Sequence, residues 1–319
     1  MRALRYSSTW TEEWNESVAH SRNGTFLFLR SYMDYHQDRF SDCSLGFIDA
    51  HDRLSAVFPA NFDQSTQTVW SHQGLTYGGL LTLPSVRYDA IENIFSLLID
   101  YYKQAGAARI VYKRIPYIYN VYPSDEDLYI FSRLKAQLYT RAISSAIDLR
   151  CPLPMSARRI RGYKKAKRAG FIVKTASGDI SQTLPFFWDV LTETLVTRHH
   201  TRPVHTLSEM QLLISRHPQH IKLVTVEDVN GQVVGGTLLF VTARVIHAQY
   251  IAANEYGRKN GALDLLFTEL VPQSHDEACY FDFGISTEQG GTILNEGLIT
   301  QKQEFGGRAV CYDSYIIPL

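Results

Sequence analysis

The apolar residues of this chain switch repeatedly between helical and strand spacing. Over residues 91–102 they recur at three- and four-residue intervals, which predicts one face of a helix that ends at Gly106. Thr9 and Glu12 have capping-box spacing ahead of a first helix, and a second helix is expected over residues 29–40. The remaining elements expected in the first half are strands at 43–49, 54–61, 66–70, 109–114 and 140–149, and a short helix at 126–137.

The second half of the chain repeats this order of elements with almost no repetition of residues. An Asn230-Gly231 pair predicts a hairpin turn, and the spacing of Thr206 and Glu209 predicts the start of a helix. The other expected elements are helices at 155–169, 184–199, 262–270 and 298–305, and strands at 171–175, 221–228, 232–242, 245–252, 280–283 and 309–317. Both halves have the order strand, strand, strand, glycine-containing loop, helix, strand, helix, strand, which predicts an α+β class with a mixed sheet.

Two closely spaced prolines mark the expected junction between the halves. Pro152 and Pro154, in the segment 150–154, block both a helix and a central strand. At about 100–200 residues per domain, the chain is long enough for two domains. We therefore predict an N-terminal domain over residues 1–150 and a C-terminal domain over residues 151–319.

Composition and charge narrow the functional classes. Lys and Arg total 32, as do Asp and Glu, so no overall field attracts the protein to nucleic acid or anionic lipid. The four cysteines lie far apart without a C-x-x-C pair, which disfavours a disulfide framework or a structural zinc site. The first residues lack an apolar signal region, and no apolar run approaches about 18 residues. These features predict a soluble, cytoplasmic protein without a membrane span.

Three short motifs near the C-terminus carry a family resemblance. They are Phe281-Asp282-Phe283-Gly284, Asn295-Glu296-Gly297 and Lys302-Gln303-Glu304-Phe305-Gly306-Gly307. Together with the order of elements, they resemble the FemABX-like acyltransferases, which have a doubled GNAT N-acyltransferase fold. The basic stretch 158–166 is similar to the helix that joins the two domains of that family. The resemblance implies two tandem GNAT-like acyl-CoA N-acyltransferase domains.

The resemblance also implies a reaction. It is transfer of an acyl group from acyl-CoA to an amine, and we expect the acceptor to be an amino sugar or a precursor of cell-surface polysaccharide or peptidoglycan. Two alternatives stay open, namely an aminoacyl-tRNA donor, as Fem-type transferases use, and a catalytically inactive module that binds glycans or nucleotides. The absence of a heptad arm favours acyl-CoA. The expected partner is a small-molecule or nucleotide-sugar acceptor, with tRNA as the alternative, and the sequence does not determine the oligomeric state.

A glycine-containing loop is the expected binding site for the donor. In the resembling family, the loop after the central strand binds the pyrophosphate of CoA on backbone N–H groups. Its signature is Gln/Arg-x-x-Gly-x-Gly/Ala, and here Arg258 and Gly261 match while Leu263 replaces the last small residue. The predicted cofactor-binding residues are Arg258, Asn260, Gly261 and Ala262.

Acyl transfer to an amine needs a group that accepts a proton and donors that face the developing oxyanion. His72 lies in a glycine-rich loop, where a plain turn is the alternative role, and a neutral imidazole suits the proton. We predict that His72 is catalytic, in a cleft between the halves that this loop and the Lys302 segment close. The same loop supplies candidates for acceptor binding, which are Gln73, Tyr77, Gly78 and Gly79.

Three residues of the C-terminal motifs complete the predicted catalytic set. Asp282 stands in an aromatic strand, so we expect it to be paired, protonated or exposed to a cleft. Glu296 is the better candidate for a general base. The resemblance gives Lys302 a contact with a phosphate or an oxyanion, whereas a lysine at a helix end is otherwise a solvated residue.

The histidine-rich segment 199–205 supplies further candidates. No metal is expected there, because an irregular loop with a proline offers no H-x-x-x-H helical face. His199 and His205 are predicted to bind the acceptor, together with Gln249 and Tyr250. The seven Lys and Arg between positions 158 and 168 indicate a solvated helical face, with binding of tRNA or of a nucleotide-sugar phosphate as the alternative.

Overall fold

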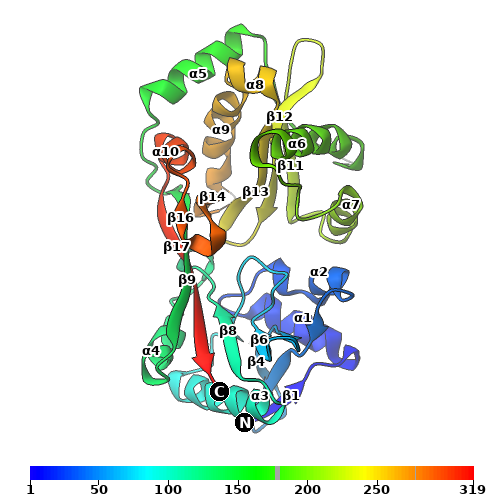
Figure 1. The fold of residues 1–319 in the computed structure, drawn as a ribbon, viewed down its shortest axis with the longest axis vertical. Helices are drawn as coiled ribbons and strands as arrows, with labels where there is room; N and C mark the ends of the chain where they lie inside the picture. Colours follow the sequence, from blue (N-terminus) through cyan, green and yellow to red (C-terminus); the bar gives the residue numbers. More distant parts are fainter. Residues whose placement is uncertain (177–179, 277) are drawn as a thin grey trace. The chain divides into compact units, whose positions relative to one another are not determined.

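The computed structural model describes residues 1–176, 180–276 and 278–319, without the side chains of His199 and His275 (Figure 1). The chain forms two compact units. Unit 1 contains Met1–Ile143, Thr287–Ile293 and Cys311–Leu319, and unit 2 contains Ser144–Ser286 and Leu294–Val310. Two short C-terminal segments thus belong to unit 1, so no single break in the chain separates the units. The domain boundary at residue 150 stays a prediction.

Unit 1 is built on two sheets. The first is antiparallel, with the strand order β1-β3-β4-β7. In the second, the strands have the order β9-β17-β8-β6-β5-β2, and β6 pairs with β8 in parallel. The element bounds are β1 Arg2–Arg5, α1 Thr11–His20, α2 Arg30–Met33, β2 Ser41–Asp42, β3 Leu45–Ile48, β4 Leu54–Phe58, β5 Asn61–Asp63, β6 Thr68–Trp70, β7 Leu81–Thr82, α3 Tyr88–Gln104, β8 Arg109–Lys113, α4 Glu126–Arg133, β9 Gln137–Asp148 and β17 Arg308–Pro318.

The apolar face of α3 forms the centre of the unit 1 core, as its spacing predicts. Ile94 and Leu98 are fully buried and belong to one cluster with Phe47 and Phe58 of the first sheet. The helix ends at Gln104, just before Gly106, whose φ of +83° a glycine adopts without strain.

The N-terminal helices differ from the prediction. α1 begins at Thr11 without a side-chain cap, because the Ser7 hydroxyl caps the preceding turn, so the predicted capping box of Thr9 and Glu12 is wrong. The helix expected over residues 29–40 is the short α2 followed by a 3-10 helix, Asp34–His36. Tertiary contacts override the local pattern here, since the buried Arg30 guanidinium pairs with two carboxylates, of Asp34 and Asp42.

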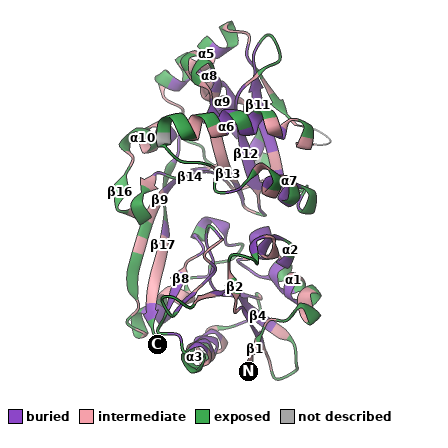
Figure 2. Ribbon diagram, turned by 45° about the vertical axis from the view of Figure 1, so that its right-hand side comes forward, coloured by how far each residue is buried: buried purple, intermediate pink, exposed green. Residues whose placement is uncertain are grey.

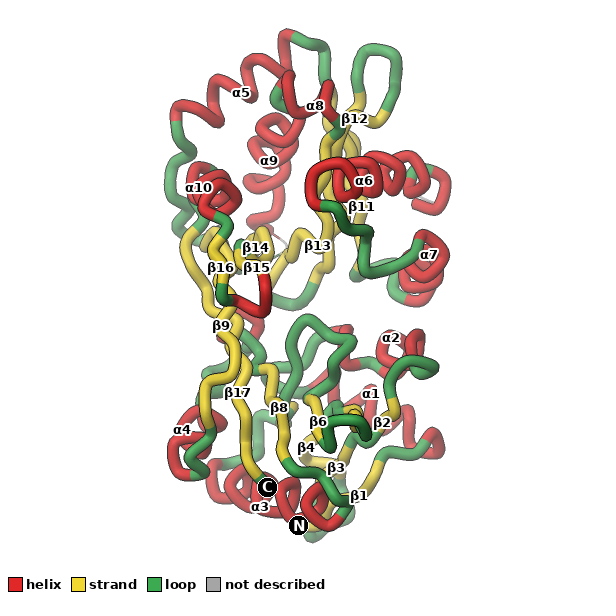
Figure 3. The backbone as a smooth tube through the Cα atoms, viewed as in Figure 1, coloured by secondary structure: helices red, strands yellow, loops and turns green. Residues whose placement is uncertain are grey.

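Unit 2 is a mixed sheet with helices on both faces (Figure 3). Its strand order is β10-β11-β12-β13-β14-β9, and β13 and β14 pair in parallel. α9 covers one face and α6 the other, and the central strands are buried while α5 and α10 expose their outer sides (Figure 2). The bounds are α5 Ala157–Arg168, β10 Ile172–Thr175, α6 Leu184–His199, α7 Leu207–Arg216, β11 Ile221–Glu227, β12 Val233–Val241, β13 Val245–Ala253, α8 Glu255–Asn260, α9 Ala262–Gln273, β14 Tyr280–Ile285 and α10 Glu296–Glu304, and the short strands β15 Thr287–Glu288 and β16 Ile293–Leu294 pair separately.

Two local signals in unit 2 are confirmed. The Thr206 hydroxyl accepts the N–H of Glu209 at 3.2 Å, and the Glu209 carboxylate accepts the N–H of Thr206 at 2.7 Å, which completes the predicted capping box of α7. The β11–β12 hairpin turns at Asn230-Gly231, where Gly231 has a φ of +77°.

The two parallel strands in the middle of unit 2 separate part-way along their length. β13 and β14 pair only at Val245↔Tyr280, Ile246↔Phe281 and His247↔Asp282. Beyond this point β13 carries a bulge, because Leu238 and Leu239 of β12 pair with Tyr250 and Ala248, which leaves Gln249 as the extra residue. The last paired position therefore lies at the mouth of an opening in the sheet.

Among the described residues, no helix has the length and apolar character that crossing a membrane requires.

Candidate active site

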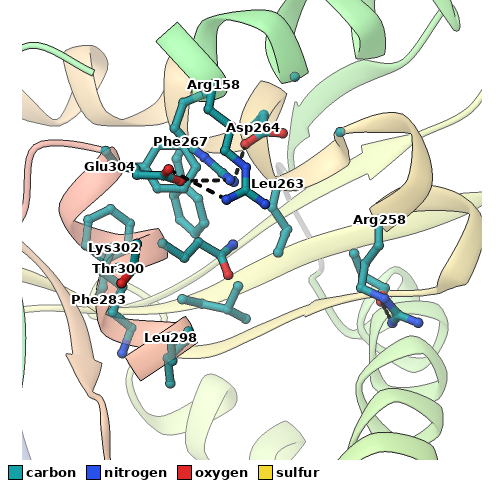
Figure 4. Close-up of a pocket in the computed structure, with 18 of the residues that line it drawn as sticks. Arg158, Arg258, Leu263, Asp264, Phe267, Phe283, Leu298, Thr300, Lys302 and Glu304 are labelled. Atoms are coloured by element: carbon teal, nitrogen blue, oxygen red, sulfur yellow. Dashed lines mark hydrogen bonds and ion pairs between the residues drawn. The ribbon is translucent and has the colours of Figure 1, made fainter. Parts of the chain in front are cut away.

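A cavity of about 950 Å³ lies within unit 2, and most of the charged residues that line it are basic (Figure 4). Its apolar part includes Ile251, Phe267 and Phe283. The charged residues that line it are the basic Arg158, Arg159, Arg161, Lys165, Arg198, Arg258, Lys259 and Lys302, and the acidic Asp264, Glu296 and Glu304. Because one sign of charge in a partly closed cavity concentrates ligands of the opposite sign, this cavity suits a ligand that has several phosphate groups and an apolar arm.

Helix α5 is therefore more than a solvated charged face. Arg158, Arg161 and Lys165 line the cavity, and the Lys165 ammonium donates to the carbonyl of Lys259 at 2.5 Å. The α5 side chains thus reach α8, where the predicted donor loop begins. Six of the seven basic residues are exposed, as expected for a solvated face, and Arg159 is the exception.

One arginine of α5 holds the cavity wall together. Arg159 is 8% exposed and pairs with Asp264 of α9 at 2.7 Å and with Glu304 of α10 at 2.9 Å. Burial raises the pKa of the Asp264 carboxyl, and the Arg159 guanidinium opposes that rise. Since both carboxylates already neutralise it, Arg159 is a structural residue rather than a free ligand-binding cation.

Part of the predicted donor loop lines the cavity. Arg258 and Gly261 line it, and Arg258 also donates to the carbonyl of Ala253 at 2.5 Å. Gly261 has a φ of +83°, and a Cβ there would lie 2.5 Å from the carbonyl oxygen of Gly162, so a glycine is needed for α5 to pass. The Asn260 amide donates to the Tyr256 carbonyl at 3.1 Å, and Ala262 is fully buried in the core.

The backbone of this loop is also suited to an anion. The N–H groups of the first turn of α9 have no helical carbonyl to bind, and they carry the positive end of the helix dipole. CoA binding by Arg258, Asn260, Gly261 and Ala262 stays a prediction, with backbone contacts at Asn260 and Ala262.

The Asp282 carboxylate is fully buried and paired, as its aromatic surroundings require. Its Oδ1 accepts from the Ser144 hydroxyl at 2.5 Å and from the N–H of Gly284 at 3.1 Å. Its Oδ2 lies 2.9 Å from Nδ1 of His247, the residue opposite it on β13. The carboxylate is thus tied to β9, β13 and its own strand at the mouth of the opening.

Lys302 lies next to this cluster, and it is buried rather than solvated, with 5% of its surface exposed. Its ammonium donates to the carbonyls of Gly284 at 2.8 Å and Ile285 at 2.7 Å, which fixes the backbone after Asp282. Burial lowers the pKa of Lys302 to about 8, and the Asp282 charge opposes this shift. Lys302 also lines the cavity (Figure 4), and it lies close enough to Asp282 for that charge to affect its pKa.

Alternation along the strands separates a core face from a site face. Ile246 and Ala248 of β13, and Phe281 and Phe283 of β14, belong to the core that α9 covers. His247 and Asp282 therefore point to the opposite face, which α6 covers.

Two of the predicted acceptor-binding residues meet on the α6 side of the sheet. The Tyr250 hydroxyl lies 2.7 Å from Nδ1 of His205, and its ring packs edge-on against Trp188 of α6. Burial raises the pKa of Tyr250. Gln249, the bulged residue, has a buried Oε1 without a hydrogen-bond partner among the described residues. His199 falls outside the described side chains.

The loop at residues 72–79 belongs to unit 1 and is packed into its interior. His72 is 3% exposed and stacks on His36 with 5.0 Å between ring centroids. Burial, reinforced by His36 and Lys113, lowers the pKa of His72 to about 2. A buried imidazole with so low an affinity for protons fits the alternative role, a loop-forming residue, better than that of a base.

The neighbours of His72 have structural partners of their own. The Gln73 side chain accepts from the Asn61 amide at 2.7 Å, and the buried Tyr77 ring packs on Tyr119 at 4.5 Å. A Cβ on Gly78 would lie 1.8 Å from the carbonyl oxygen of Ser71, and one on Gly79 would meet the Tyr112 ring at 2.6 Å. A role for these residues in catalysis or acceptor binding stays a prediction, as does a cleft shared with the Lys302 segment.

Glu296 is exposed at the first position of α10 and lines the cavity. It lies in unit 2 with Asp282 and Lys302. Within the described parts of the chain, no three His, Cys, Asp or Glu side chains are grouped as metal ligands would be.

Comparisons with known proteins identify the fold of this chain. Residues 156–289 match the family model described as an acetyltransferase (GNAT) domain. The structure of FemX aligns with a TM-score of 0.72 and 10% identity, over 100% of this chain and 98% of that chain. The chain has a FemABX-like tandem GNAT fold. Its GNAT domain places it among the acyltransferases, and both the predicted fold class and the predicted enzyme class are confirmed.

Two further structures have this fold at similarly low identity. L-PGS from Bacillus licheniformis aligns with a TM-score of 0.62 and 12% identity, over 97% of this chain and 90% of that chain. A tandem GNAT protein from the clavulanic acid biosynthesis pathway aligns with a TM-score of 0.55 and 10% identity, over 99% and 98% of the two chains. No curated protein matches the sequence.

Sequence reasoning missed two residues of the cluster in the GNAT domain. His247 is marked in the sequence as a polar residue in the mainly apolar β13, whereas Ser144 is one of several polar residues of β9 and has no such mark. Neither could be linked to Asp282 without knowing that β14 lies between β13 and β9.

Proposed function

We propose that this protein transfers an acyl group from acyl-CoA to an amine acceptor, and that the donor binds in the basic cavity of unit 2. The observation that carries the proposal is the position of this cavity, which residues of the GNAT domain and of α10 line, against the start of α9. CoA carries three phosphate groups on its nucleotide part and has a long pantetheine arm, which suits basic side chains beside Ile251, Phe267 and Phe283.

The acceptor is proposed to enter on the α6 side of the sheet, where His205 and Tyr250 meet. Neutral polar groups in an aromatic setting suit the hydroxyls and amine of an amino sugar. An amino sugar, free or within a precursor of surface polysaccharide or peptidoglycan, is therefore the acceptor class that we propose.

An aminoacyl-tRNA donor is the second candidate. It is favoured by the basic side chains that α5 exposes outside the cavity, such as Lys164 and Arg168, which could contact additional phosphates. The two donors need different surfaces: acyl-CoA needs the cavity alone, whereas an aminoacyl-tRNA also needs the basic side chains outside it.

Calorimetric titration with CoA and acetyl-CoA tests the donor. We expect saturable binding that weakens as salt is raised and that Arg161→Met weakens at least several-fold, while Lys164→Met, outside the cavity, leaves it unchanged. No binding of CoA or acetyl-CoA, with tight binding of an aminoacyl-tRNA, would instead establish the second candidate.

The transfer itself is tested by release of the CoA thiol from acetyl-CoA in the presence of amino sugars, both free and UDP-linked. Accelerated release with one of them, and a product heavier by one acetyl group, supports the proposal. Binding of CoA without transfer to any amine would indicate the catalytically inactive binding module.

A further inference from the structure

One ring nitrogen of His247 contacts a carboxylate, and the other has no hydrogen-bond partner among the described residues. Its Nδ1 lies 2.9 Å from Oδ2 of Asp282, and the tautomer that carries the proton at Nδ1 donates it to that oxygen. Nε2 forms no hydrogen bond with any residue that the structure describes. In this tautomer the ring presents a lone pair at Nε2, and the contact with Asp282 fixes the orientation of the ring.

Asp282 is well placed to hold this ring. The carboxylate is fully buried, and its other oxygen is fixed by Ser144 and by the N–H of Gly284. Gly284 lies beside the imidazole, since a Cβ there would come 3.4 Å from Cε1 of His247, and its φ of +77° favours glycine. The side of the ring next to Gly284 is thus kept free of a side chain.

The position of the pair in the fold points to the chemistry. His247 and Asp282 are the last paired residues before β13 and β14 separate, and they face the α6 side of the sheet rather than the α9 core. The His247 side chain is 12% exposed, so its open nitrogen lies in a mostly dry site. The α6 side is also where His205 and Tyr250 mark the proposed acceptor site.

We propose that Nε2 of His247 takes the proton of the acceptor amine, and that Asp282 is the positioning residue that makes this possible. The inference rests on the proposed function. The amine nitrogen attacks the carbonyl carbon of the thioester, a C–N bond forms, and the C–S bond breaks. The nitrogen loses one proton to Nε2, and the imidazolium returns that proton to the leaving sulfur, so CoA departs as the thiol and His247 is neutral again.

Groups from four elements surround the ring. β14 contributes the charged Asp282, and α10 contributes Lys302 through its contact with Gly284. β12 places the non-ionisable Phe240 opposite His247, and β9 contributes the neutral Ser144 behind Asp282.

Kinetics with acetyl-CoA and the best amino sugar acceptor test the role of His247. We expect His247→Asn to lower kcat about 10²–10³-fold and to leave CoA affinity unchanged. Free imidazole should restore part of the rate of His247→Ala, which a purely structural role would not allow. His220→Asn is the matched control, since His220 in the same unit bonds the carbonyl of Val241, and it should retain full activity. Full activity of a folded His247→Asn protein overturns the proposal.

A second measurement needs no turnover. In the ¹⁵N-histidine NMR spectrum of the wild-type protein, we expect the His247 signal, identified by its loss in His247→Asn, to show protonation at Nδ1. Asp282→Asn should shift it toward the Nε2-protonated form. A wild-type His247 protonated at Nε2 overturns the proposal even if acetyl-CoA is the donor. A protein that binds no CoA but shows the Nδ1-protonated ring disproves the donor instead, and leaves the histidine pair supported.

Discussion

At the scale of single residues, His72 links stability to pH. The unfolded chain binds a proton at this histidine below its usual pKa of about 6.5, whereas burial keeps the folded form neutral down to about 2. The unfolded state therefore binds more protons, and the free energy of unfolding falls as pH drops below 6.5, by up to about 1.4 kcal/mol per pH unit for this group.

We expect His72→Asn to reduce this slope, because asparagine tolerates the φ of +72° at this position and carries no titrating ring. Urea denaturation at several pH values between about 4 and 7 measures the slope. His51→Asn, on an exposed turn, is the control and should keep the wild-type slope. If the free energy of unfolding of His72→Asn depends on pH as steeply as that of the wild type, the His72 ring is not the source of this dependence.

Lys302 combines a structural and a functional role. Its ammonium satisfies two carbonyls at the edge of the cavity, so Lys302→Met leaves both without a donor and should cost about 1–3 kcal/mol of stability. If the ammonium also faces the negative charge of the donor or the oxyanion, kcat should fall about 10²–10³-fold in protein that is still folded.

Chemical denaturation together with initial rates separates the two effects of Lys302→Met. Lys164→Met, an exposed lysine outside the cavity, should change neither quantity. We expect His72→Ala to impair turnover less than Lys302→Ala does. A Lys302→Met protein of reduced stability but wild-type rate would reduce this lysine to a structural residue.

At the scale of elements, two arginines of α5 that lie two positions apart have different expected roles, one in the stability of the fold and one in ligand binding. Arg159 holds α9 and α10 through Asp264 and Glu304, and removing one partner of a buried pair costs about 3–5 kcal/mol. Arg161 lines the cavity and makes no ion pair or hydrogen bond with the described residues. We therefore expect Arg159→Met to lower the Tm strongly and Arg161→Met to change it little.

Calorimetry on both variants gives the complementary readout. Arg161→Met should weaken CoA binding at an unchanged Tm, whereas Arg159→Met should lower the Tm whether or not CoA is present. Equal effects of the two substitutions on the Tm would contradict the idea that the ion pairs of Arg159 with Asp264 and Glu304 stabilise the fold.

At the scale of the whole molecule, the last nine residues belong to the unit that also contains the N-terminus. Ser314–Pro318 of β17 pair with β8, and the buried Ile317 is part of the α3 core. Without Cys311–Leu319, β8 loses a neighbour inside the second sheet of unit 1. We expect a chain that ends at Val310 to be cleaved by low protease concentrations within residues 1–143, while unit 2 stays protected.

Mass spectrometry of the fragments locates these cuts, and a chain that ends at Pro318 is the control, since it keeps the β8–β17 pairing. Resistance of the shorter chain equal to that of the full chain would show that unit 1 does not depend on its C-terminal strand.

The sequence alone determined the features that depend on neighbours along the chain. The apolar spacing at residues 91–102 gave α3, the pair Thr206 and Glu209 gave the α7 cap, and the C-terminal motifs pointed to the GNAT fold. These signals are local, because a helical face or a cap involves residues only three or four positions apart.

Tertiary structure alone decided what depends on contacts across the chain. It buried Lys302 and His72, committed Arg159 to two carboxylates, and set His247 opposite Asp282 at the point where their strands separate. Residues 247 and 282 are brought together by the register of a parallel pair, which a connection of more than thirty residues allows but does not encode in any short pattern. Whether a polar residue is solvated, structural or chemical is settled by such long-range packing, because desolvation depends on what the rest of the chain places around it.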